Sequence, residues 1–200
     1  MTKARARMLW AALSSAVGAV LLVAGLPKVR DRERMIRVVR GYRVLPDGMA
    51  SIAGTLLPWV EIVLGLALVL GVAPRVSGYL AAALFAVFLV GLSVNLIRGR
   101  RDLDCGCFAF GGGADEIEHI GWLHSARAAA FALASAATAF TPAVAVLDRV
   151  AGAGIGLFAV AVVCVGLYVR SFMSMGRQPI DDYLTNAAIE MRAVSSISRY

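Results

Sequence analysis

Charge is scarce in this chain, and its scarcity decides the class of protein. Asp, Glu, Lys and Arg make up only 16% of the 200 residues, whereas hydrophobic residues make up 60%. An average soluble domain is about 45–50% apolar. Uncharged runs of roughly 20 residues match the hydrocarbon thickness of about 30 Å that a helix crosses at about 1.5 Å per residue. A soluble globular domain is therefore excluded, and we predict one integral membrane domain.

Cysteine and histidine are scarce as well, with three and two residues respectively. Three cysteines cannot form a disulfide scaffold, and an odd number leaves one thiol without a partner. The net charge of +7 does not indicate nucleic-acid binding, because the basic residues flank apolar runs and no nucleic-acid-binding motif is present. Lys and Arg at such positions orient a membrane protein and bind anionic headgroups. We expect membrane lipid as a partner and no nucleic acid.

The apolar runs predict an all-α integral membrane protein with five spans, at about residues 8–26, 49–72, 76–97, 121–140 and 150–169. The first span follows a basic segment, as a signal peptide does. It is nearly long enough to cross a bilayer and stops at Pro27 without a small-residue cleavage site, so we expect it to be retained.

These spans divide the chain into three parts. Residues 1–140 hold the first four spans, which form a four-helix transmembrane bundle. Residues 141–170 add a fifth transmembrane helix, and residues 171–200 form a polar tail.

A basic segment, residues 27–48, separates the first two spans. Arg34, Arg37 and Arg40 fall on one side of a helical wheel. The apolar residues of the segment fall on the other side: Met35, Val38, Val39 and Tyr42. This pattern predicts an interfacial amphipathic helix with its arginines toward the headgroups. A solvated linker helix is the alternative.

Two thiols one residue apart, Cys105 and Cys107, lie in the polar break before the fourth span. As a redox pair they would close a small strained disulfide, which is readily reduced and therefore oxidising. Gly106 supplies the backbone freedom for such a ring. Two alternatives stay open: a zinc or copper site completed by His119 or His124, and two small residues in a tight loop.

Several polar residues are candidates to support thiol chemistry. Glu61 lies in the second span, where a lone carboxylate is costly and should face the bundle interior. Asn95 lies one turn from the end of the third span, and Arg98 precedes the cysteines, where it can stabilise a thiolate. His124 and Arg127 share one face of the fourth helix and could relay a proton or bind an anionic group. The structural alternative for Glu61 is a hydrogen bond to another helix. For His124 and Arg127 it is anchoring at the membrane interface. Cys164 is predicted to be a buried apolar residue.

Four motifs, found in order over about residues 8–140, resemble the methylamine-utilisation MauE family of the MauE/DoxX redox-associated membrane proteins. They are AGLPKVRD at 24–31, GYRVLP at 41–46, LPWVE at 57–61 and NLIRGRRDLDCGCF at 95–108. The last motif is the specific one. The family's usual glycine after the phenylalanine is Ala109 here, which concerns the shape of the loop and not the cysteines.

The resemblance implies a membrane-embedded thiol–disulfide oxidoreductase that supports disulfide formation in exported proteins beside a thioredoxin-like partner. The family's Cys-Gly-Cys carries over to Cys105 and Cys107. A weaker architectural similarity to vitamin K epoxide reductase-like enzymes makes a quinone near Glu61, His124 and Arg127 a candidate acceptor; no cofactor is certain. The rival reading is a non-catalytic scaffold whose loop binds a partner or a metal.

The two sides of the membrane cannot be assigned by charge alone. With five spans, the side of the cysteine loop carries fourteen Lys and Arg residues and the other side five, which favours a cytoplasmic loop. The basic flank of the first span argues for the opposite orientation. Disulfide formation requires an oxidising compartment. We therefore expect a multi-pass cell-membrane protein with the cysteine loop on the exterior face.

Overall fold

A computed structural model of the protein describes residues 2–100, 103, 120–142 and 144–175. Within them the chain forms helices and no strand, which confirms the all-α prediction. The helices are α1 (Thr2–Arg30), α2 (Arg32–Gly41), α3 (Asp47–Leu70), α4 (Pro74–Ile97), α5 (Trp122–Thr138) and α6 (Val146–Met175).

Four of these helices, α1, α3, α4 and α6, are long and apolar enough to cross a membrane. The chain is thus a multi-pass membrane protein, as predicted. The predicted fourth span, 121–140, coincides with α5, which is shorter than expected at 17 residues. At about 1.5 Å per residue α5 covers about 26 Å, so it is not among the four full-length spans.

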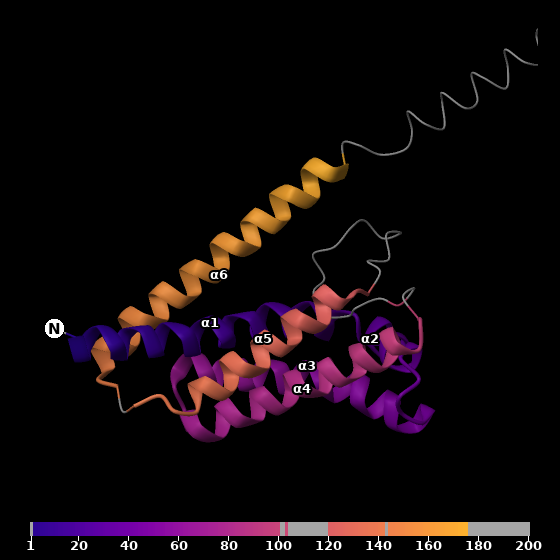
Figure 1. The fold of residues 1–200 in the computed structure, drawn as a ribbon, viewed down its shortest axis with the longest axis horizontal. Helices are drawn as coiled ribbons and strands as arrows, with labels where there is room; N and C mark the ends of the chain where they lie inside the picture. Colours follow the sequence, from indigo (N-terminus) through magenta and orange to yellow (C-terminus); the bar gives the residue numbers. More distant parts are fainter. Residues whose placement is uncertain (1, 101–102, 104–119, 143, 176–200) are drawn as a thin grey trace, which may run out of the picture.

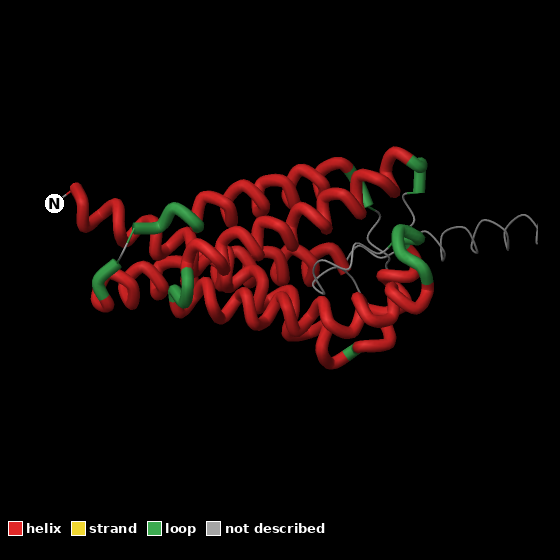
Figure 2. Tube along the Cα trace, turned by 90° about the horizontal axis from the view of Figure 1, so that it is seen from below, coloured by secondary structure: helices red, strands yellow, loops and turns green. Residues whose placement is uncertain are grey.

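Helices α1, α3, α4 and α5 form a bundle in which each lies beside two of the others (Figures 1 and 2). One end of the bundle, the turn end, carries the α3–α4 turn and the start of α6. The other, the loop end, carries α2 and the α4–α5 connection. The core is apolar and includes Leu21, Leu68 and Phe85. Phe85 stacks on Phe131 with ring centroids 5.2 Å apart.

Helix α1 is one wall of this bundle because small residues let it touch α3. A Cβ added to Gly18 would lie 2.6 Å from the carbonyl oxygen of Gly65, and one added to Gly65 would lie 2.8 Å from that of Gly18. Small residues permit such close backbone approach between membrane helices. The Ser14 hydroxyl also donates to the Leu68 carbonyl oxygen at 2.8 Å.

Helix α2 lies within the predicted amphipathic segment 27–48 and packs on the first half of α3. Met35 is buried, and the arginines of the opposite side are exposed. Arg32 Nε donates to Thr55 Oγ1 at 3.0 Å, and Arg40 Nη2 donates to Ser51 Oγ at 2.7 Å. The apolar side of α2 therefore covers α3, and two arginines at its border hold it there.

Helix α6 docks on the bundle only near its start. Arg149 Nη2 donates to the carbonyl oxygens of Leu68 and Val69 at the end of α3. Gly152 and Gly156 lie against α1 so closely that a Cβ on either would overlap its atoms. Farther along, α6 diverges from the bundle (Figure 1). Cys164, predicted to be buried, is partly exposed for this reason.

Candidate functional site

A buried ion pair joins α1 to α3 inside the bundle. Lys28 Nζ lies 2.6 Å from Glu61 Oε1 and 2.9 Å from Oε2, and the two side chains are 9% and 1% exposed. The ammonium also lies 5.6 Å from the centroid of the Phe88 ring on α4. A lysine near a helix end usually extends toward the headgroups. Lys28 instead turns inward, and its charge balances a carboxylate that would be costly alone in a membrane.

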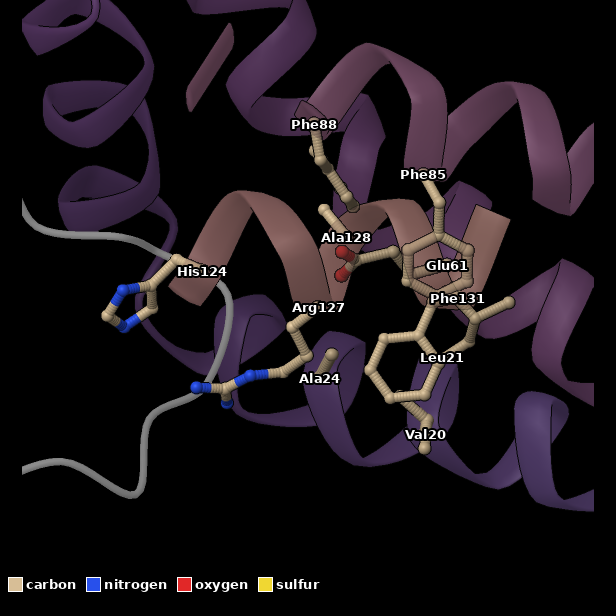
Figure 3. A pocket seen from close by; sticks show the side chains of 10 residues that line it. All are labelled: Val20, Leu21, Ala24, Glu61, Phe85, Phe88, His124, Arg127, Ala128 and Phe131. Carbon is tan, nitrogen blue, oxygen red and sulfur yellow. The ribbon is translucent and has the colours of Figure 1, made fainter. Parts of the chain in front are cut away.

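Glu61 also lines a pocket between α1, α3, α4 and α5. Aromatic rings of α4 and α5 form much of its wall (Figure 3). The lining residues are Val20, Leu21, Ala24, Glu61, Phe85, Phe88, His124, Arg127, Ala128 and Phe131. The cavity volume is about 30 Å³, and about 10–15 Å³ holds one water molecule. The pocket is thus a narrow, mostly apolar slot with charged or titratable groups at a few points.

The outer part of this pocket belongs to the first two turns of α5. His124 and Arg127 extend from that helix, and Glu61 reaches toward it from α3 (Figure 3). His124 Nδ1 accepts a hydrogen bond from the Gly121 backbone N–H at 3.2 Å. In this arrangement Nδ1 carries no proton, so a neutral His124 carries its proton on Nε2. His124 thereby holds the start of α5 and lines the pocket.

The beginning of the α4–α5 connection is anchored at the end of α4. Asn95 is fully buried; its Nδ2 donates to the Gly91 carbonyl oxygen at 3.0 Å, and its Oδ1 accepts from Arg100 Nη1 at 3.3 Å. The Arg100 backbone N–H also donates to the Asn95 carbonyl oxygen at 3.0 Å. Gly99 makes this turn possible with a φ of +72°. Asn95 thus fixes the chain where it leaves α4.

Arg98 ties the same end of α4 to the segment after α2. Its Nη1 donates to the Arg43 carbonyl oxygen at 3.4 Å. Leu103 and Tyr42 pack against a second buried apolar cluster that contains Leu92 and Ile120. Both ends of the α4–α5 connection are therefore held at the loop end of the bundle.

The predicted redox pair itself, Cys105 and Cys107, lies outside the described residues, as does His119. Within the described ranges no group of three or more His, Cys, Asp or Glu side chains could hold a metal ion. The metal alternative, which needs the cysteines, stays a prediction.

The structure brings Glu61, His124 and Arg127 to one pocket and places Asn95 and Arg98 at the neighbouring loop end. Sequence reasoning missed Lys28, the partner of Glu61. The sequence pattern places Lys28 in the basic segment 27–48, without a partner inside the bundle. The available signal was the pairing of one acidic residue within a span with a lysine directly at the end of another.

Comparison with known proteins points to one family. The family model described as methylamine utilisation protein MauE matches residues 6–141. The chain is 35% identical to the MauE protein of Methylophilus methylotrophus over 63% of this chain and 65% of that protein. It is 32% identical to that of Methylorubrum extorquens over 78% of this chain and 81% of that protein.

A third relative, the MauE protein of Paracoccus denitrificans, is 38% identical over 52% of this chain and 55% of that protein. The alignments thus span less than two thirds of the Methylophilus and Paracoccus denitrificans proteins. No solved structure matches the chain significantly.

Proposed function

The chain belongs to the methylamine utilisation protein MauE family, and we propose that it is a membrane-embedded thiol–disulfide redox protein. Cys105 and Cys107 form the redox pair. They exchange electrons with a thioredoxin-like partner and so support the maturation of exported disulfide-containing proteins. The relatives are named for methylamine utilisation. We extend to this chain an accessory role in methylamine utilisation.

The observation that carries the proposal is the anchoring of both ends of the α4–α5 connection beside the pocket. Leu103 packs in the buried cluster at the loop end. Cys105 follows it by two residues, and an extended chain covers at most about 3.6 Å per residue. Chain connectivity therefore keeps the Cys105 Cα within about 7 Å of the Leu103 Cα. His124, at the other end of the connection, lines the pocket.

The chemistry is a thiol–disulfide exchange in two steps. A thiolate of the partner attacks one sulfur of the Cys105–Cys107 disulfide, which forms a mixed disulfide and releases the other cysteine as a thiolate. The second thiolate of the partner then attacks the mixed disulfide. The partner leaves as a disulfide, and Cys105 and Cys107 remain as a dithiol after taking up two electrons and two protons.

The sequence predicts a quinone as a candidate acceptor beside this pocket. Glu61, His124 and Arg127 line the pocket together with the aromatic wall. The cavity volume of about 30 Å³ is, however, far below the roughly 300 Å³ at which small-molecule pockets begin. The pocket in this conformation therefore does not fit a quinone ring.

We further propose that the cysteine pair faces the exterior, because disulfide formation needs an oxidising compartment. Helix α2, the end of α4 and the start of α5 lie at the same end of the bundle (Figure 1). Labelling of Cys105 and Cys107 in intact cells with a membrane-impermeant thiol reagent, after reduction, tests this. Absence of labelling, with labelling restored in lysed cells, would indicate a cytoplasmic thiol reductant.

Trapping of the mixed disulfide tests the redox role. Cys105→Ser and Cys107→Ser are expressed separately, cells are quenched with acid, and proteins linked to the chain are resolved without reductant. We expect at least one variant to accumulate a reducible adduct with a thioredoxin-like protein and to lower client oxidation. Cys164→Ser serves as the matched control and should do neither. No adduct and no oxidation defect in either variant would favour the non-catalytic scaffold.

A further inference from the structure

Exposed arginines lie on α2 and next to its ends. The role inferred for them does not depend on the cysteines. Six arginines and two acidic residues lie between Arg30 and Arg43, for a net charge of +4. All six arginines are exposed. Five of them form what we name the α2 basic face: Arg30, Arg32, Arg34, Arg37 and Arg40. Arg37 Nη1 lies 3.9 Å from Glu33 Oε2 in a solvent-exposed ion pair, which neutralises little of the charge of Arg37.

The α2 basic face lies beside a membrane span. Arg32 binds Thr55 and Arg40 binds Ser51, so α2 lies along α3. Thr55 is eight residues past the start of α3 at Asp47, about 12 Å along the helix axis. Since α3 is one of the four helices able to cross a membrane, α2 lies beside the span and not beyond its end.

Beside Ser51 and Thr55, the exposed residues of α3 next to this face are apolar. Ile52 and Leu56 are 62% and 55% exposed on the same part of the helix, which suits contact with lipid. Arginine at such a depth is costly unless its guanidinium reaches the headgroups or pairs with an anion. A soluble protein or a nucleic acid would approach the end of the bundle from water. A lipid phosphate lies at the side of the span, where these guanidinium groups are.

We propose that the α2 basic face binds the phosphate headgroups of anionic phospholipids. The planar guanidinium donates two parallel hydrogen bonds to a phosphate, which adds to its charge attraction. The hydrogen bonds from Arg32 and Arg40 to α3 set the position of α2, and Arg30 and Arg37 are placed to take the headgroup. A basic residue near an anionic membrane surface contributes about fivefold in binding.

Native mass spectrometry of the full-length protein in detergent tests this site, with dioleoyl-phosphatidylglycerol and dioleoyl-phosphatidylcholine as probes. The variant Arg30→Gln/Arg37→Gln leaves the hydrogen bonds to Ser51 and Thr55 intact. The matched control Lys3→Gln/Arg5→Gln removes the same charge from two exposed residues at the turn end. We expect the wild type to retain phosphatidylglycerol in preference to phosphatidylcholine. The α2 variant should bind phosphatidylglycerol at least tenfold more weakly than the wild type does.

The control variant should bind phosphatidylglycerol within about twofold of the wild type. An equal loss in both variants would mean general charge attraction and would overturn the proposal, as would equal retention of the two lipids. Competition by inorganic phosphate or heparin at physiological salt would instead indicate a soluble anion or polyanion as the occupant. Circular dichroism of both variants checks that the helices are retained. None of these outcomes depends on Cys105 or Cys107.

Discussion

Lys28 and Glu61 form a two-pronged ion pair in the bundle interior, with Nζ 2.6 and 2.9 Å from the two carboxylate oxygens. The pair joins the end of α1 to the middle of α3 and borders the pocket that His124 also lines. Its geometry explains how a carboxylate is tolerated in the second span: it is neither alone nor exposed to lipid.

Removing one member of this pair should be worse than removing both. Glu61→Leu or Lys28→Met leaves an unpaired buried charge, which costs about 3–5 kcal/mol, whereas a well-packed apolar pair in place of a buried ion pair is often tolerated. Thermal unfolding in detergent should therefore rank the double variant Lys28→Met/Glu61→Leu above either single variant.

The matched control for that series is Glu33→Gln. Glu33 is 90% exposed in its ion pair with Arg37, and an exposed pair contributes about 0–1 kcal/mol. Its unfolding temperature should stay close to that of the wild type. Additive effects of the two single substitutions in the double variant would show that Lys28 and Glu61 are not energetically coupled.

Two glycines of α6 should differ in their response to alanine. A Cβ on Gly156 would overlap the Ala12 carbonyl oxygen and lie 2.9 Å from the Ala16 backbone nitrogen, whereas Gly166 has nothing within 4 Å. Gly156→Ala should separate α6 from α1 and increase proteolysis of the α5–α6 link. Gly166→Ala should leave proteolysis unchanged, since alanine is the better helix former by about 1 kcal/mol. Equal proteolysis of the two variants would argue against this docking.

Arg149 should act as a cap on the end of α3. Its guanidinium binds the carbonyl oxygens of Leu68 and Val69, and hydrogen bonds to a charged group contribute about 1.5–3 kcal/mol each. Arg149→Gln should lower the unfolding temperature in detergent, while Arg75→Gln, an exposed arginine at the same end, should not. Equal shifts would mean that overall charge matters and the cap does not.

Asn95 and Arg100 should be coupled in a double-mutant cycle. Asn95 Oδ1 accepts from Arg100 Nη1 at 3.3 Å, and residues that share a hydrogen bond typically show interaction energies of about 0.5–3 kcal/mol. Asn95→Ala, Arg100→Ala and the double variant are compared by thermal unfolding and by mixed-disulfide trapping. If the two single effects add in both measurements, Asn95 does not hold the start of the connection through Arg100.

The sequence predicted the fold well because apolar length is a local property. The long runs in α1, α3, α4 and α6 are unambiguous, and the arginine spacing around Met35 predicts α2. The sequence could not show that Lys28 turns inward, because a lysine at the end of a span normally points to the headgroups. Nor could it show that α6 leaves the bundle after Gly156, since its composition resembles that of a packed span.

Redox state is the property on which the proposed function depends most. Cells are quenched with acid, and the chain is alkylated with a mass-shifting thiol reagent before and after reduction. We expect one cysteine, Cys164, to react before reduction, and Cys105 and Cys107 to react only after it. Full alkylation of all three cysteines before reduction, in protein taken from aerobic cells, would contradict the central claim that Cys105 and Cys107 form an oxidising pair.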